Sequence, residues 1–367
     1  MTTHTATAPR GFASRNNLLT LAAMGVLLIL LFVFERSFDT FTMQIFKLCA
    51  INVILALSLN LINGFTGLFS LGHAGFMAVG AYTCAILTMS PAQKSMNYVL
   101  QPIVPWLANI HLPFVPALLL AGVVAGLLGW LLGFIALRLR DDYLAIATLG
   151  FSEIIRVILT NLQSITNGAF VLKGLPRFTT MWWAWGAAVA CTVFMVLLIR
   201  STYGRSFKAI RDNEIAAEAM GINIFGMKVL SFSISSAMAG IAGALLAHHL
   251  TTIDPKQFIF LKTFDILLIV VLGGVGSITG SVIAAIVVTV SMEALRFLDG
   301  PLNLGLLTTS GTPGLRMVFF SVLLMVVIIF RQRGLMGTHE FSWDSLAKIG
   351  LLPKRKTPND SSEGTQS

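Results

Sequence analysis

Residues 263–295 read TFDILLIVVLGGVGSITGSVIAAIVVTVSMEAL. This apolar run is much longer than the about 20 residues that one helix needs to cross a bilayer. Its centre, residues 273–280, holds four glycines with Ser277 and Thr279, and glycine weakens a helix interior. We therefore predict two short or re-entrant helices that meet at this glycine-rich break.

The apolar character extends over the whole chain. Of 367 residues, 56% are hydrophobic and only 11% are charged, and the mean hydropathy is +0.83. Soluble domains carry about 25% charged residues, so this chain cannot cover a soluble surface. We predict an all-α, polytopic transmembrane helical bundle. Besides the broken run, stretches long enough to span lie at residues 17–34, 42–61, 65–88, 115–137, 143–162, 181–199, 225–250 and 315–330.

The glycine-rich break also bears on the orientation of the chain in the membrane, because it sets the number of crossings. If the broken run crosses twice, the chain has about ten spans, and both termini lie on one side. Loops on that side hold most of the basic residues, including Arg138, Arg205 and Lys208. Because cytoplasmic loops carry the Lys/Arg excess, we predict cytoplasmic termini and a multi-pass protein of the plasma (inner) membrane.

Three regions follow from this pattern. Residues 1–16 form a cytoplasmic tail, residues 17–337 the transmembrane domain, and residues 338–367 a polar, largely disordered cytoplasmic tail. The first apolar run is interpreted as a retained helix, because charged residues follow it instead of the small-residue cleavage site of a signal peptide.

Several function classes are disfavoured. The net charge of +9 comes from charges at the ends of apolar runs, which disfavours a nucleic-acid-binding stripe. Cys49, Cys84 and Cys191 lie in apolar stretches without the spacing of a zinc site or a disulfide framework. No metal site or nucleophile–base pair is apparent, so we expect neither an enzyme nor a bound cofactor.

Small residues recur on the faces of two predicted helices. Such faces let helix backbones approach closely in lipid. We expect packing within this subunit, with a seam against a second membrane subunit as the alternative. The residues are Gly122, Gly126, Gly129 and Gly133 on one helix, and Ala239, Gly240, Gly243 and Ala244 on the other.

Ionisable residues inside spans are candidates for function. Glu153 and Arg156 lie three apart, so they can pair on one helix face. His248 and His249 lie at a predicted helix end, where we expect exposure at the membrane interface. The full set is Lys47, His73, Glu153, Arg156, His248, His249, Asp265 and Glu293.

A second glycine-rich segment, residues 63–76, reads NGFTGLFSLGHAGF. Broken helices of this kind can line a solute path, although a buried histidine such as His73 can equally be a structural donor. The candidate path residues are Asn60, Thr66, Ser70, His73 and Glu153. The glycines assigned a structural role are Gly64, Gly67, Gly72, Gly75, Gly274 and Gly276.

The longest polar stretch on the predicted cytoplasmic side is residues 200–224. Asp212 or Asn213 can cap a helix there, and Gly221 can end it. Ile215, Ala219 and Met220 are then available for docking. Because two turns are unstable alone in water, the helix must pack against something: a partner, the membrane surface or the rest of the chain.

Four segments, in order, resemble the M-type permease subunit of branched-chain amino acid ABC importers. The likeness extends from about Ile51 to Gly337, but residues 167–174 lack the more glycine-rich outer loop of many members. The segments are 63–82 (NGFTGLFSLGHAGFMAVGAY), 143–156 (YLAIATLGFSEIIR), 208–222 (KAIRDNEIAAEAMGI) and 272–280 (LGGVGSITG).

The resemblance implies a permease working with a second homologous permease, two cytoplasmic ATP-binding subunits and an extracytoplasmic solute-binding protein. No Gly-Lys dipeptide occurs, so a phosphate-binding loop is absent and partners must bind the ATP. By resemblance, the residues that couple to the ATPase are Asn213, Glu214, Ala216, Ala217, Glu218, Ala219 and Gly221.

The expected substrates are leucine, isoleucine and valine. Urea, short amides or other amino acids would fit an apolar path with a few hydroxyl groups equally well. A rival from another class is an ion-coupled secondary transporter, which would need an acidic residue deep in a span.

Overall fold

A computed structural model describes residues 36, 39–139, 141–296, 302–303, 308–309, 318, 321–322, 325, 329 and 334–337. The predicted first span at residues 17–34 and both predicted tails lie outside the described residues. Most of the predicted last span, residues 315–330, does so as well.

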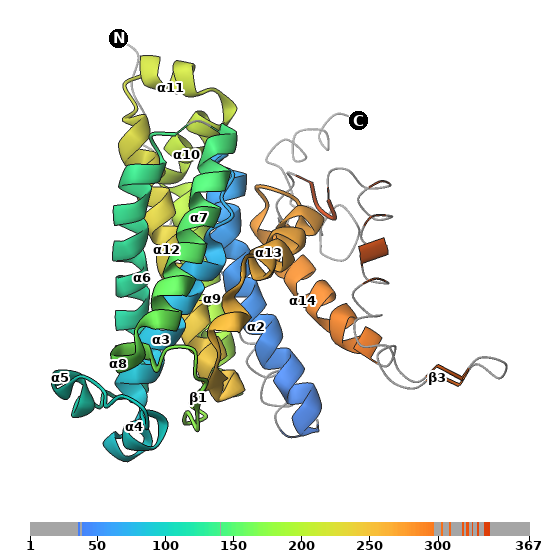
Figure 1. Ribbon diagram of the computed structural model, residues 1–367. Helices are drawn as coiled ribbons and strands as arrows, with labels where there is room; N and C mark the ends of the chain where they lie inside the picture. Colours follow the sequence, from blue (N-terminus) through green and yellow to red (C-terminus); the bar gives the residue numbers. More distant parts are fainter. Residues whose placement is uncertain are drawn as a thin grey trace, which may run out of the picture. The chain divides into compact units, whose positions relative to one another are not determined.

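The described part is a bundle of helices (Figure 1), which confirms the all-α membrane architecture. Five helical segments are long and apolar enough to cross a bilayer, and α3 and α14 are shorter apolar helices. The main helices are α2 (Thr40–Asn60), continued by the π-helical η1 (Leu61–Thr66), α3 (His73–Thr88), α6 (Phe114–Ala136), α7 (Asp141–Asn161), α9 (Met181–Arg200), α12 (Ile224–Leu250), α13 (Phe260–Gly273) and α14 (Ile278–Ala294).

Short elements mark the two ends of this bundle (Figure 1). The hook, α10 (Thr202–Asp212) and α11 (Glu214–Ala219), lies at one end, which we call the hook end. The opposite loop end carries α4 (Pro91–Asn97), α5 (Pro105–Ala108), α8 (Gln163–Thr166) and β1 (Leu172–Lys173). β1 pairs antiparallel with β2 (Thr252–Ile253), which precedes η2 (Pro255–Phe258), and β3 (Leu302–Asn303) pairs with β4 (Thr308–Thr309).

Helix α2 forms the centre of the core. Every residue from Cys49 to Asn60 is buried, and α2 packs against α9, α12, α13 and α14. The polar residues of α2 explain its position, because Asn52 and Asn60 find hydrogen-bond partners on α14 and at its start, which lipid could not supply.

Helices α3, α6 and α12 pack through their small residues. A methyl group on Gly80 would lie 2.1 Å from the Gly240 carbonyl oxygen, and one on Gly243 would lie 2.0 Å from that of Met77. Gly126 and Gly129 of α6 face α12 in the same way. The predicted packing within the subunit is therefore confirmed.

The glycine-rich break is also confirmed. Helix α13 ends at Gly273 and α14 begins at Ile278, and Gly274 and Gly276 adopt φ angles of 111° and 86° between them. Ser277 starts α14 by accepting a hydrogen bond from the Gly280 backbone N–H at 3.1 Å. The long apolar run is thus two short helices.

The prediction for His248 was wrong. Its side chain is fully buried, because the chain around Pro176 folds back over the end of α12. Nδ1 of His248 donates to the Pro176 carbonyl oxygen at 2.9 Å, and Nε2 lies 3.1 Å from the Thr88 hydroxyl. This histidine closes the loop end instead of facing the membrane interface.

The crossing of α3 and α12 gives a stability prediction. Gly80→Ala should destabilise the protein by about 1–3 kcal/mol, because the added methyl group overpacks a tight backbone contact. The thermal midpoint of the detergent-purified protein, followed by size-exclusion chromatography, measures this effect. Gly186→Ala in α9, with no atom within 4 Å of the new methyl group, is the matched control. Equal midpoints for the two variants would contradict the packing.

Candidate functional site

The hook has the local geometry that its sequence predicts. The Asn213 side chain caps α11 by accepting a hydrogen bond from the Ala216 N–H at 3.0 Å. Glu214 occupies the first turn, where a negative charge is favourable. Gly221 follows the helix with a φ of +80°, a conformation that glycine adopts without strain.

Contacts along both helices fix the hook to the bundle. The Lys228 ammonium at the start of α12 lies 2.6 Å from the Glu214 carboxylate. Ala217 of α11 is buried, as are Phe207 and Ile210 of α10. The hook is therefore braced at several points.

Its tip presents apolar surface. Ile215 is 81% exposed and Met220 is 83% exposed, and Glu218 and Ala219 beside them are exposed as well. Large apolar side chains this open are typical of residues that dock into a partner.

Arg211, at the end of α10, connects the hook to both helix breaks. Its Nη1 donates to the Gly64 carbonyl oxygen in η1 at 3.3 Å. The same nitrogen lies 3.1 Å from the position that a methyl group on Gly276 would take, and the Arg211 backbone packs equally closely on Gly67, whose φ is +77°. Sequence reasoning missed this role, because η1 and Gly276 lie far from Arg211 in the sequence.

The Asn60 side chain links the end of α2, where η1 begins, to the turn between α13 and α14. Its Nδ2 donates to the Ser277 carbonyl oxygen at 2.9 Å and to the Ser281 hydroxyl at 2.8 Å. Its Oδ1 accepts from the Gly276 N–H at 2.9 Å. Gly64 must be glycine, since a methyl group there would lie 1.9 Å from this oxygen.

The other candidates in this region are also held by the protein. His73 is buried with Nε2 2.7 Å from the Ser58 hydroxyl, and the Thr66 hydroxyl donates to the Leu61 carbonyl oxygen at 2.9 Å. The Ser70 hydroxyl accepts from the Gly72 N–H at 3.4 Å. Their role in a solute path stays a prediction.

Two predicted structural glycines support this segment. A methyl group on Gly72 would lie 2.7 Å from the Thr148 carbonyl oxygen, and one on Gly75 would lie 2.9 Å from Ser152 Cα. These contacts hold the start of α3 against α7.

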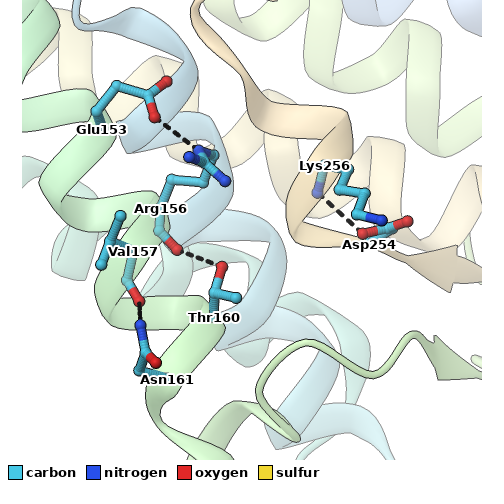
Figure 2. A network of polar contacts seen from close by, with 7 residues as sticks. All are labelled: Glu153, Arg156, Val157, Thr160, Asn161, Asp254 and Lys256. Atoms are coloured by element: carbon cyan, nitrogen blue, oxygen red, sulfur yellow. Dashed lines mark hydrogen bonds and ion pairs between the residues drawn. The ribbon is translucent and has the colours of Figure 1, made fainter.

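Glu153 lies apart from this cluster, on α7. Its carboxylate pairs with Arg156 at 2.7 Å (Figure 2), which confirms the predicted ion pair. The two side chains are 30% and 28% exposed, so each keeps contact with the surroundings of the subunit.

Among the described residues there is no group of three or more His, Cys, Asp or Glu side chains that could hold a metal ion. Cys49, Cys84 and Cys191 are free and buried.

Comparisons with known proteins agree with this geometry. The family described as branched-chain amino acid transport system / permease component matches residues 41–328. The chain is 35% identical over 289 residues to the high-affinity branched-chain amino acid transport system permease protein LivM of Escherichia coli K12, covering 70% of this chain and 64% of that relative. It thus spans somewhat under two thirds of that relative's length.

More distant relatives are covered more fully. The probable permease protein LivM of Methanocaldococcus jannaschii is 26% identical, over 77% of this chain and 89% of its own length. The permease protein LivH of Escherichia coli K12 is 25% identical, over 71% and 87% respectively. No solved structure matches. Because the family match covers most of the chain, the protein belongs to the family of branched-chain amino acid transport system permease components.

Proposed function

We propose that this chain is the membrane-spanning permease subunit of an ATP-driven ABC importer that carries leucine, isoleucine and valine inward. Family membership together with the braced, apolar-tipped hook carries this proposal. The partners are a second homologous permease, two cytoplasmic ATP-binding subunits and an extracytoplasmic solute-binding protein. The chain itself is not an enzyme and binds no cofactor, since the partners bind the ATP.

In this proposal the hook end faces the cytoplasm, the chain makes about ten crossings of the plasma (inner) membrane, and both termini are cytoplasmic. The basic residues at the hook end support the orientation, because positive loops stay inside. They include Arg200, Arg205, Lys208 and Arg211. Successive helices also run alternately toward and away from the hook end, as a multi-pass chain must.

The hook transmits closure of the ATP-binding subunits. Ile215 and Met220 enter a groove on the ATPase, and Asn213, Glu214, Ala216, Ala217, Glu218, Ala219 and Gly221 give the hook its shape. A push on α11 passes through α10 to Arg211, and from there to η1 and to the turn between α13 and α14. Rigid-body movement of this kind is common in transport and switching proteins.

The solute path runs beside these breaks. Glu153 contacts the path directly, whereas Asn60, Thr66, Ser70 and His73 hold the broken helices that border it. This division rests on burial, because Glu153 is partly exposed while the other four are buried and hydrogen-bonded.

Urea, short amides or other amino acids are the alternative substrates. The ion-coupled transporter is less well supported. Three acidic residues of the described spans each have a basic residue three positions away: Glu153 with Arg156 at 2.7 Å, Asp265 with Lys262 at 3.9 Å, and Glu293 with Arg296 at 2.8 Å. An ion site would favour an acid without such a partner.

Uptake of labelled leucine by cells with the complete set of subunits tests the function. We expect uptake that vanadate blocks and that ionophores leave intact, because ATP hydrolysis supplies the energy. Collapse of uptake by ionophores would contradict the ABC mechanism. The ligand that copurifies with the binding protein separates branched-chain amino acids from urea, amides and other amino acids.

The hook tip gives a second prediction. Met220→Asp should weaken co-purification of the ATP-binding subunits by about tenfold or more, since burying a charge at a docking anchor is costly. Met96→Asp, at a 78% exposed position of α4 at the loop end, is the control and should leave the complex intact. Unchanged co-purification of the Met220 variant would show that the hook docks elsewhere.

Arg211 gives a third prediction. Arg211→Ala should leave the ATPase bound but lower leucine uptake per ATP hydrolysed by roughly tenfold, because it removes a charged hydrogen bond between the hook and η1. Arg205→Ala on the same helix is the control, as Arg205 bonds only to Thr202 of α10 among the described contacts. Equal uptake per ATP in the two variants would remove Arg211 from the coupling route.

A further inference from the structure

Two charged residues of α7 lie well inside a candidate span. Glu153 and Arg156 come eight and five residues before the end of α7 at Asn161, so at 1.5 Å per residue they lie about 12 Å and about 8 Å from that end. Their neighbours Ile154 and Val157 are exposed and apolar, which agrees with a membrane location.

A segment without α-helix, residues 251–259, contacts α7. After α12 ends at Leu250, the chain pairs through β2 at the loop end and then turns inward through η2, which contacts α3 and α7. The helix that follows, α13, contacts the start of α3, where the Thr263 hydroxyl accepts a hydrogen bond from the Ala74 N–H at 3.0 Å. Figure 2 shows Asp254 and Lys256 of this segment in the same close-up as the α7 residues, with the Asp254 carboxylate bound to the Lys256 backbone N–H.

The segment has one buried side and one open side. Pro255 and Phe258 are buried in the bundle, whereas Lys256 and Gln257 are exposed. The Asp254 carboxylate accepts from the Lys256 backbone N–H at 2.9 Å, which starts η2 and leaves the lysine ammonium outside this turn. Charges of both signs thus come from two elements onto one surface.

This surface is not suited to lipid. A charged side chain in hydrocarbon costs several kcal/mol, and such residues face protein or a water-filled cavity. Irregular backbone at membrane depth is tolerated only under the same conditions. The exposed Lys256 and the partly exposed ion pair therefore call for water or protein, and not lipid, on this side of the subunit.

We propose that Glu153, Arg156, Asp254 and Lys256 line a water-filled recess, open toward the loop end, that binds zwitterionic amino acids in transit. The inference rests on the proposed function and names the chemistry of its path. The Arg156 guanidinium matches the geometry of a carboxylate, with Lys256 beside it, and the two acids receive the ammonium group. Because Glu153 and Arg156 already pair with each other, the recess binds weakly, as a site of passage must.

Cysteine labelling tests whether the recess holds water. In a background with Cys49, Cys84 and Cys191 replaced by alanine, Arg156→Cys and Lys256→Cys are introduced singly into the complete complex. We expect a cationic, membrane-impermeant methanethiosulfonate to label both from outside intact cells. Val193→Cys, 43% exposed on the apolar helix α9, is the control and stays unlabelled. If both recess positions stay unlabelled, or label only from the cytoplasmic side, the proposal is overturned.

A neutral double variant tests binding. Glu153→Gln with Arg156→Gln leaves no lone charge, so folding is preserved, which labelling of Lys256→Cys in that variant verifies. Leucine uptake should fall roughly tenfold, through loss of charged hydrogen bonds, while ATP hydrolysis stimulated by the binding protein remains. Unchanged uptake would overturn the binding role. Failure of the wild-type complex to show vanadate-sensitive uptake would instead reject the proposed function, and the labelling result is independent of it.

Discussion

The structure depends on how a membrane protein pairs the polar groups of a broken helix. In lipid, backbone N–H and C=O groups freed by a break have no water to bind. Here Asn60 supplies the partners, because its amide makes three hydrogen bonds with Gly276, Ser277 and Ser281. The end of α2 and the turn between α13 and α14 therefore form one joint, and Gly64 lets the two backbones meet.

The hook contacts this joint directly. Arg211 contacts η1 at Gly64 and approaches Gly276, so the two breaks share one contact with α10. Phe207 and the Lys228–Glu214 pair keep the hook from bending independently. Stiffness matters because a short helix held at one point would yield under a push, whereas one braced at several points passes the push on. In the proposed importer, the polar joint and the braced hook together transmit movement of the ATP-binding subunits.

Features set by local sequence could be predicted. The break after Gly273, the Asn213 cap, the glycine at position 221 and the Glu153–Arg156 pair all follow from residues within one or two helical turns. Features set by distant contacts could not. Lys94 lies in a polar stretch between two predicted spans, yet it is buried and donates to the Leu107 and Ile110 carbonyl oxygens, and burial lowers its pKa. Likewise, the residues next to His248 in the sequence give no sign that Pro176 covers it. The four residues of η2 are too few to show a hydrophobic periodicity from which the element could be predicted.

The arrangement of charge in the spans fits a protein that lets solutes pass instead of holding them. Glu153, Asp265 and Glu293 each pair with a basic residue three positions away in the sequence. Such pairs lower the cost of placing charge near lipid, but they also occupy the groups that would otherwise grip a ligand. In the proposed path, a self-paired charge such as Glu153 therefore offers the solute a weak contact. In the proposed importer, selectivity then comes from the solute-binding protein outside the membrane, and this chain opens and closes the route for the solute.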